Sequence, residues 1–549
     1  MQYLKRLIKF FNVVVLVLGL LIPLALFLNR FLIPDVSFDS LNYHLYLGFK
    51  GLNWQNNQFE FYPTGIYNFS SILEIFGYIL MQVFGYRIGT IGSLIFLYLS
   101  IIVLYKIFRL YNPKVKVLGR WWFGLVFVSM FLSFEAFLQI STYYIDIEVA
   151  FLMLLVWYFL LKYEKKKKLI NLLMSAVMMA FLLLGKMTTW YFLLPYFGYL
   201  FLTLLKDKKQ TIKQKLFKFL LVGVISISLL IPWMFNNFRV TGNPVFPFYN
   251  GIFNSEYFID ENFSQGFGGI GFLEKLFYWF YSAKNPIKLG EVHDLFTDYK
   301  ISIYFITSVV ILFWAWYRKD KEIVKFSVFY LITYLCWSFT FGYLRYGLLL
   351  EFLGGLLLLM FFVRLKTSWK YLIIASITII MVIQGKRIVN MSLAYDISFR
   401  SGYFYNRVTY PEEIKNLNKN EISINVDDME RYQPNVYLNC AIPNLAYYVL
   451  SDFNNLPVLN IDFRANGDLV SNLEYNSKIG LKLRRYHDNG SKIRFVTITT
   501  KEGLNSQYLD CINNLKNKNY IILEEIPFND FLGYSGQKLV MIFGEFELI

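Results

Sequence analysis

Long apolar runs recur along the first 390 residues, separated by short stretches of lysine, arginine and other polar side chains. Each run is roughly 17–22 residues long, the length of helix that crosses a hydrocarbon core of about 30 Å. The pattern therefore predicts an α-helical polytopic membrane protein with about eleven spans. They lie near residues 10–28, 88–108, 118–136, 146–163, 169–185, 188–205, 219–235, 301–317, 324–341, 346–363 and 370–386.

One further apolar segment, residues 66–85, departs from this pattern. It is long enough to span, yet it carries the polar residues Asn68, Ser70, Ser71, Glu74 and Gln82. Counting it as a span would move every later basic cluster to the other face of the membrane. We therefore predict a helix that lies in the outer interface with one apolar side.

The chain changes character after about residue 400, where Asn, Asp, Glu and Lys become frequent. The residues 503–517 are typical of a helix, and short apolar bursts are typical of strands. These bursts are 422–426, 446–450, 493–498, 520–523 and 539–543. The sequence thus predicts two domains: a membrane domain over 1–390 with outer loops 29–87 and 236–300, and an extracytoplasmic C-terminal α/β domain over 400–549.

Composition agrees with a membrane protein, since 56% of the 549 residues are hydrophobic and 20% aromatic, and mean hydropathy is +0.42. The formal charge of +16 comes from short basic clusters at every second connection. Such spacing is the positive-inside signal, so it argues against nucleic-acid binding and predicts a cytoplasmic N-terminus with a retained first span. The clusters are 5–9, 106–120, 162–168, 206–218, 318–325 and 364–370.

The three cysteines predict little chemistry. Cys336 falls inside a span, where a thiol packs as a small apolar group. Cys440 and Cys511 both fall in the tail, and the sequence does not decide whether they form a disulfide. The sequence has no metal motif of the Cys/His type.

Polar residues, most of them ionisable, gather on the predicted outer face. They are Asp35, Asp39, His44, Asp146, Glu148, Lys186, Arg239, Asn243, His293, Asp294 and the Arg345–Tyr346 pair. Acids and cations are costly at a membrane boundary unless they have a task there. The competing interpretation is that loops on any face are polar.

Five of these stretches, in this order, resemble motifs of the bacterial GT-C superfamily, multi-spanning glycosyltransferases that use polyprenyl-phosphate-linked sugars. The stretches are Phe38–Leu45 (FDSLNYHL), Thr142–Asp146 (TYYID), Gly185–Thr188 (GKMT), Asn237–Pro247 (NFRVTGNPVFP) and Leu344–Tyr346 (LRY). The fourth departs from the family pattern, because Asn237 precedes Arg239 where the pair is expected to be adjacent and in Arg-Asn order. The tail adds no motif.

The resemblance implies a polyprenyl-phosphate sugar as donor and Asp39 as catalytic base, with His44 beside the substrate. Asp146 would orient the acceptor, and Asp39 and Asp146 would hold a divalent cation if one takes part; no other cofactor is expected. Lys186, Arg345, Tyr346 and Arg239 would bind the donor phosphate, since a leaving phosphate gains charge.

Plainer interpretations stand beside these roles. Asp35 is expected to be a solvated or helix-capping residue, and Lys186 at a span end can simply snorkel. His293 and Asp294 are typical of a solvated loop. Glu351 lies inside a span and needs a polar partner, which the sequence does not identify. The glycine-rich 266–271 stretch follows no strand, so it does not predict a dinucleotide site.

We expect an inverting glycosyltransferase in the bacterial cytoplasmic membrane that acts on the outer face, on a lipid, glycan or protein acceptor. One alternative is a glycan polymerase or ligase, which shares the lipid-linked substrate. Another is a lipid-linked sugar flippase or transporter, although the sequence lacks the internal repeat that transporters often show.

Overall fold

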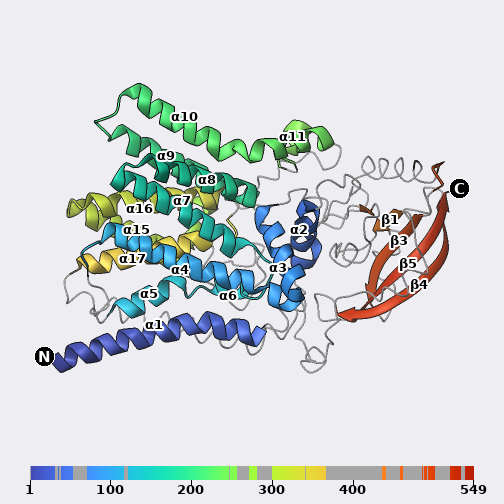
Figure 1. The fold of residues 1–549 in the computed structure, drawn as a ribbon, viewed down its shortest axis with the longest axis horizontal. Coiled ribbons are helices and arrows are strands. Elements are labelled where there is room, and N and C mark those ends of the chain that lie inside the picture. The colour runs from blue at the N-terminus through green and yellow to red at the C-terminus, as the bar shows by residue number, and fades with distance from the viewer. Residues whose placement is uncertain are drawn as a thin grey trace.

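The structure is a computed structural model that covers the whole chain, and part of it is described below. The described residues are 2–30, 35, 39–52, 71–115, 122–246, 248–255, 271–280, 300–340, 342–365, 436–439, 458–460, 485, 488–490, 493–500, 520–532 and 538–548. Figure 1 shows a bundle of long helices with a β-sheet beyond one of its ends, opposite the N-terminus.

The long helices run side by side in the bundle (Figure 1). They are α1 (Gln2–Arg30), α4 (Ile91–Tyr111), α7 (Asp146–Lys166), α8 (Leu169–Gly185), α9 (Leu193–Leu205), α10 (Ile212–Ser228), α15 (Lys300–Tyr317), α16 (Lys321–Thr340) and α17 (Leu348–Arg364). Every residue of α17 from Leu348 to Phe362 is buried. A helix that is buried on every side is surrounded by protein rather than by lipid, which makes α17 the centre of the core.

The predicted class, an α-helical polytopic membrane protein, is confirmed. Among the described residues, seven helices are long and apolar enough to cross a membrane, or eight if one bent pair counts as a single span. That pair is α10 with α11 (Leu230–Thr241), bent by 51° near Leu229. The predicted span at 219–235 therefore contains a bend, and the predicted span at 370–386 lies outside the described residues.

The predicted span at 118–136 is divided into two short helices. The first, α5 (Phe123–Phe131), ends at Leu132, and the second, α6 (Phe134–Gln139), begins where the Ser133 hydroxyl accepts a hydrogen bond from the Ala136 backbone N–H. A serine that caps the second helix explains why the helix does not continue. Hydropathy alone does not register such a break.

Helix α3 (Ile72–Gly89) covers most of the segment predicted to lie in the interface. It meets the length and composition of a span, but it bends at Gly85, whose φ of 80° suits glycine. Figure 1 shows it beside α2 (Leu45–Leu52), at the end of the bundle that faces the sheet. Its interfacial placement stays a prediction.

The basic clusters meet at the other end of the bundle. There Arg364 donates to Asp320 at 2.6 Å and to Asn112 at 3.1 Å, and Lys325 pairs with Glu164. These pairs join four connections that are distant in the sequence. The charges that predict the topology thus lie on one side of the molecule.

Five strands in the tail form one mixed sheet in the order β2-β1-β3-β5-β4. They are β1 (Val436–Asn439), β2 (Val458–Asn460), β3 (Ile493–Thr500), β4 (Tyr520–Leu532) and β5 (Lys538–Leu548). Strands β1, β2 and β3 are parallel, whereas β5 is antiparallel to β3 and β4. Three predicted bursts fall on β3, β4 and β5. The bursts at 422–426 and 446–450 and the predicted helix 503–517 lie outside the described residues, so the α/β domain stays a prediction.

Candidate functional site

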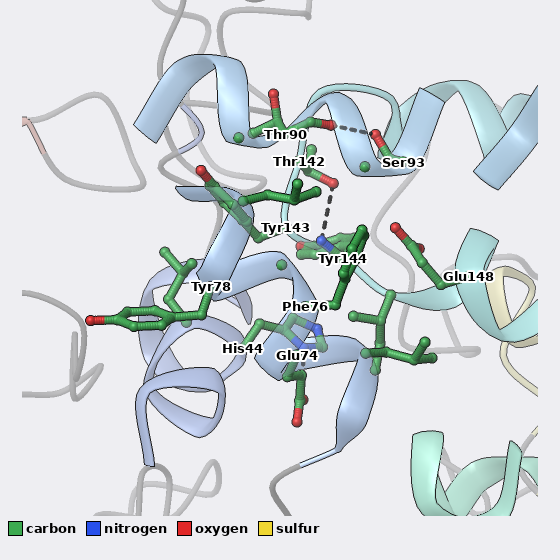
Figure 2. Close-up of a pocket in the computed structure, with 17 residues that line it drawn as sticks. His44, Glu74, Phe76, Tyr78, Thr90, Ser93, Thr142, Tyr143, Tyr144 and Glu148 are labelled. Atoms are coloured by element: carbon green, nitrogen blue, oxygen red, sulfur yellow. Dashed lines mark hydrogen bonds and ion pairs between the residues drawn. The ribbon is translucent and has the colours of Figure 1, made fainter. Parts of the chain in front are cut away.

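His44 lies in a π-helical turn, Ser40–His44, that leads directly into α2. Its Nδ1 is 3.0 Å from Glu74 Oε1 on α3, and both side chains are buried. Glu74 is held by a capping box, in which it accepts from the Ser71 N–H at 2.9 Å while the Ser71 hydroxyl accepts from the Glu74 N–H. Figure 2 shows the pair at the edge of a small cavity. The turn after α1 is thereby fixed against α3.

Burial and the nearby Lys186 and Arg345 cations hold the pKa of His44 well below its usual value, although Asp39 acts in the opposite direction. The imidazole is therefore neutral at neutral pH, and its contact with Glu74 is a hydrogen bond. Whichever of the two residues carries the shared proton, His44 Nε2 is left as a buried atom without a partner among the described residues.

Asp39 begins this turn and forms an ion pair with Arg345, 306 positions later in the chain. Arg345 Nη1 is 2.5 Å from Asp39 Oδ2, and the two side chains are 14% and 9% exposed. Burial alone would raise the pKa of Asp39, but the charge of Arg345 brings it below its usual value. The carboxylate is thus ionised in the resting site.

Three tyrosine rings surround the Arg345 guanidinium. Its carbon lies 5.2 Å from the Tyr346 ring centre, 5.3 Å from that of Tyr144 and 5.8 Å from that of Tyr343. Aromatic faces attract a cation and do not neutralise it. Arg345 therefore keeps its full charge for an anion.

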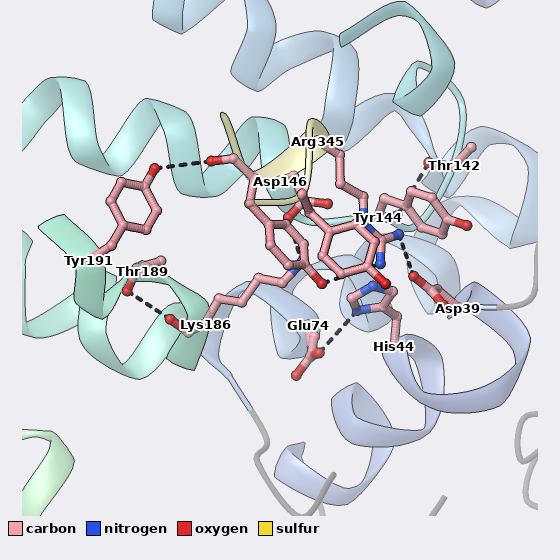
Figure 3. A network of polar contacts seen from close by, with 12 residues as sticks. Asp39, His44, Glu74, Thr142, Tyr144, Asp146, Lys186, Thr189, Tyr191 and Arg345 are labelled. Carbon is pink, nitrogen blue, oxygen red and sulfur yellow. Dashed lines mark hydrogen bonds and ion pairs between the residues drawn. The ribbon is translucent and has the colours of Figure 1, made fainter. Parts of the chain in front are cut away.

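A second ion pair lies next to the first. Lys186, which directly follows α8, places its Nζ 2.5 Å from Oδ1 of Asp146, the first residue of α7. The same Nζ lies 4.3 Å from the centre of the Tyr346 ring. Tyr346 is thus in contact with both cations, and Figure 3 shows the two ion pairs as one network with His44 and Glu74.

The structure therefore brings together Asp39, His44, Asp146, Lys186, Arg345 and Tyr346, all predicted from the sequence. Arg239 does not join them: it is exposed on α11. The nearby Asn243 is buried in a local turn, where it donates to the Phe248 carbonyl at 3.0 Å and accepts from the Val245 N–H at 2.9 Å. That motif shapes the chain after α11.

Asp35, which was expected to be a solvated or helix-capping residue, is not solvated. It is fully buried, and its Oδ2 accepts from the Ser40 hydroxyl at 2.6 Å and from the Tyr143 backbone N–H at 2.8 Å. It thereby connects the turn after α1 to the segment before α7. Its place in the structure is a brace between the two predicted carboxylate motifs.

Glu351 has the polar partner that the sequence required. Lys300 Nζ, at the start of α15, lies 2.9 Å from Glu351 Oε2 on α17. Cys336 is a half-buried free thiol on α16. The stretch 266–271 and the residues His293, Asp294, Cys440 and Cys511 lie outside the described residues.

Three contributors to the site were not predicted from the sequence: Glu74, Tyr144 and Tyr343. The spacing S-x-x-E at Ser71–Glu74 is that of a capping box and signals the capping role of Glu74. It does not signal the contact with His44. Tyr144 lies inside the Thr142–Asp146 stretch and Tyr343 directly before Leu344–Tyr346, but no role was predicted for either of these two among 42 tyrosines.

The two aspartates predicted as possible metal ligands are both paired with cations in the structure. Among the described residues, no group of three His, Cys, Asp or Glu side chains could hold a metal ion. The residues present do not fit a divalent cation in this arrangement.

No family model matches the chain, and no curated protein sequence does. Among solved structures, the chain is similar to the crystal structure of ArnT from Cupriavidus metallidurans bound to undecaprenyl phosphate, with 11% identity, a TM-score of 0.46 and coverage of 96% of this chain and 97% of that chain. It is also similar to the apo structure of the same protein, with 12% identity, a TM-score of 0.43 and the same coverage. Likeness of this degree leaves the assignment of function to the chain's own residues.

Proposed function

We propose that this protein is a membrane glycosyltransferase that moves a sugar from a polyprenyl-phosphate donor to a lipid, glycan or protein acceptor, with Asp39 as the base. The observation that carries the proposal is the meeting of two carboxylate–cation pairs, Asp39–Arg345 and Asp146–Lys186, around the single side chain of Tyr346. Four segments distant in the sequence supply these groups at one end of a membrane bundle. The motif resemblance to GT-C glycosyltransferases supports the same class.

The reaction needs three tasks done at once. The acceptor hydroxyl forms a bond to the anomeric carbon while the bond from that carbon to the phosphate oxygen breaks. The phosphate leaves with the electron pair, and the hydroxyl proton passes to a carboxylate. Asp39 takes that proton, and Arg345 and Lys186 stabilise the charge that develops on the phosphate.

The resting ion pairs must open for this to happen. A donor phosphate offers Arg345 and Lys186 a more highly charged partner than a carboxylate, and arginine binds phosphate through two parallel hydrogen bonds. Once Arg345 turns to the phosphate, the influence that lowers the pKa of Asp39 is weakened. Donor binding thus frees Asp39 to accept a proton, and Asp146 to orient the acceptor.

A cavity beside Arg345 has room for about one water molecule while the ion pairs are closed, and we expect it to widen for the lipid phosphate once they open. Its lining includes Arg345, Tyr346 and Thr188 together with the apolar Leu348 and Leu349. A charged end with an apolar continuation matches a phosphate on a hydrocarbon chain. By the positive-inside rule, this end of the bundle is the extracytoplasmic face of a bacterial cytoplasmic membrane.

The test is sugar transfer by an Asp39→Asn variant. Membranes that contain the protein and its acceptor are given undecaprenyl phosphate carrying a radiolabelled sugar, and label that leaves the lipid is measured. Loss of a general base lowers such a rate by about 10²–10⁴-fold, so the variant is expected to fall in that range. Glu164→Gln, which alters a carboxylate at the other end of α7, is the matched control and keeps the rate.

Two outcomes contradict the proposal. If Asp39→Asn transfers sugar at the wild-type rate, Asp39 is not the base. If the wild-type protein moves the intact lipid-linked sugar between leaflets and never separates sugar from lipid, the protein is a transporter.

A further inference from the structure

The π-helical turn after Asp39 places His44 on the same side as the Asp39 carboxylate. Its closing hydrogen bond runs from the Leu45 backbone N–H to the Ser40 carbonyl, five residues earlier. Residues five apart therefore lie near one another in this turn, whereas in an α-helix they are about 140° apart around the axis. Both side chains lie beside the Arg345 guanidinium (Figure 3). His44 is thus placed to contact Asp39 when Arg345 turns away.

Glu74 holds the other side of the His44 ring. Its Oε2 accepts from the Ser71 backbone N–H at 2.9 Å, so its Oε1 is the atom that faces His44 Nδ1, at 3.0 Å. The state of Glu74 decides which ring nitrogen bears the hydrogen. A carboxylate accepts from Nδ1–H, whereas a carboxylic acid donates to Nδ1 and leaves the hydrogen of a neutral imidazole on Nε2.

The surroundings of Glu74 favour the carboxylic acid. The residue is 6% exposed, and no lysine or arginine among the described residues forms an ion pair with it. Burial raises the pKa of Glu74 to about 8, against the opposing effects of its Ser71 hydrogen bonds and of Lys186. Lys186 itself is paired with Asp146. At neutral pH Glu74 therefore donates to Nδ1, and the neutral His44 bears its hydrogen on Nε2.

We propose that Glu74 and His44 are positioning residues for Asp39: Glu74 fixes the tautomer of His44, and His44 Nε2–H donates to the Asp39 carboxylate when the donor phosphate draws Arg345 away. The inference rests on the proposed function. This hydrogen bond replaces the one that Arg345 gives up, and it keeps the carboxylate oriented toward the acceptor hydroxyl. A neutral donor depresses the basicity of a carboxylate less than a cation does, so Asp39 stays able to take a proton.

Other titratable and charged groups face His44 and Glu74 from the neighbouring elements. They are Asp39, Lys186, Arg345, Glu148, Tyr43, Tyr78, Tyr143 and Tyr144. In addition, Lys50 on α2 titrates in the same range as Glu74, because burial lowers its pKa to about 8. A test by pH must therefore compare proteins that share all of these groups and differ only at position 74.

The pH dependence of sugar transfer tests the proposed role. Transfer from the radiolabelled lipid is measured below KM for the donor, so that the rate reports kcat/KM and the ionisation of the free enzyme. As the pH rises through about 8, Glu74 loses its proton to the solvent, the hydrogen of His44 moves to Nδ1, and Nε2 presents a lone pair to Asp39. The wild-type kcat/KM is expected to fall about tenfold between about pH 7 and about pH 9.5.

Glu74→Gln separates this effect from every other titration. Its side-chain oxygen accepts from the Ser71 N–H, so its amide NH2 faces His44 Nδ1 and donates to it at every pH. This variant is expected to lack the tenfold alkaline fall and to be faster at neutral pH than Glu74→Ala, which donates nothing to Nδ1. The matched control, Glu164→Gln, alters a carboxylate paired with Lys325 at the other end of α7 and keeps the wild-type fall.

The tautomer can also be observed without turnover and without a variant at position 74. The chain has three histidines, so nitrogen-15 labelling of histidine in the full-length protein in lipid bilayers gives few signals. The His44 signals are those that His44→Asn removes. Solid-state nuclear magnetic resonance is expected to show the hydrogen on Nε2 at about pH 7 and on Nδ1 above about pH 9.

The inference and the proposed function fail in different ways. A wild-type protein that never separates sugar from lipid contradicts the proposed function, and the role at Asp39 falls with it. Transfer that falls equally with pH in the wild type and in Glu74→Gln overturns the inference alone, as expected if Nε2 contacts only the water-sized cavity that His44 also lines. A His44 that bears its hydrogen on Nδ1 at neutral pH likewise overturns the inference alone.

Discussion

Arg345 shows how single residues combine in this site. It is joined to Asp39 by an ion pair, surrounded by three tyrosines and linked to the Tyr346 hydroxyl at 3.3 Å. A lysine at this position would keep the charge and lose the planar, two-pronged donor set that matches a phosphate. The identity of the cation therefore matters to the proposed chemistry, beyond its charge.

His44 is expected to make stability depend on pH. Its folded pKa lies well below 6.5 because of burial and of Lys186 and Arg345, while Asp39 and Glu74 also face it. As the pH falls, the unfolded chain binds the proton first, so this stability is present above pH 6.5 and is lost as the pH falls toward the folded pKa. Lowering the pH from 7 to 5.5 should cost the wild type about 1 kcal/mol more than His44→Asn.

The measurement is the thermal midpoint of both proteins in nanodiscs across that pH range. Asn at position 44 can keep a contact with Glu74 but cannot be protonated, so it controls for the loss of the ring. If the thermal midpoint falls equally with pH in the two proteins, His44 does not titrate between pH 7 and 5.5.

At this scale, sequence reasoning identified charged residues and missed their neutral surroundings. Asp39, Asp146, Lys186 and Arg345 stand out because ionisable groups are rare beside apolar runs. Tyr144 and Tyr343 carry no such signal in a chain rich in tyrosine. Asp35 was misjudged, because its burial depends on Ser40 and on the distant Tyr143 backbone.

At the scale of elements, the break between α5 and α6 explains why a lysine is buried in the bundle. Lys300 Nζ donates to the carbonyl oxygens of Leu132 at 2.9 Å and of Met130 at 3.3 Å, which lie at the end of α5, and it pairs with Glu351. One ammonium thus joins three helices. Glu351 lies in the first turns of α17. Arg345 belongs to the short 3-10 turn that leads into this helix, so the contact supports the helix that directly follows the proposed phosphate-binding residue.

Removing only one partner of this pair should be damaging. Lys300→Met leaves the Glu351 carboxylate buried and uncompensated, which costs about 3–5 kcal/mol. The double variant Lys300→Met, Glu351→Leu removes both charges and should recover most of that loss. Thermal unfolding of the three proteins measures the effect. If Lys300→Met is as stable as the wild type, the Lys300–Glu351 ion pair does not contribute to stability.

Hydropathy predicted the helices where apolar runs are long, and it failed at their ends. The break at Ser133 and the bend near Leu229 arise from a capping side chain and from packing, and neither changes mean hydropathy. Mean hydropathy also did not decide whether α3 spans the membrane or lies in its interface, since the helix is apolar enough to span. Its membrane position depends on neighbours such as α2, which lie elsewhere in the sequence.

At the scale of the whole molecule, the bundle has two chemically different ends. One end gathers the basic clusters and their partners, including Arg364, Asp320 and Lys325. The other carries the two ion pairs, with the C-terminal sheet beyond it (Figure 1). This polarity follows from the alternation of basic connections in the sequence, and it is the part of the architecture that sequence reasoning predicted best. Which acid pairs with which cation in the cluster became visible only in the three-dimensional structure.

The most direct test of the account is the structure of the full-length protein in nanodiscs with undecaprenyl phosphate, determined by electron cryomicroscopy. The account predicts phosphate oxygens within hydrogen-bond distance of the Arg345 guanidinium and of Lys186 Nζ, with Asp39 released from Arg345. A phosphate bound elsewhere while both ion pairs stay closed would contradict it.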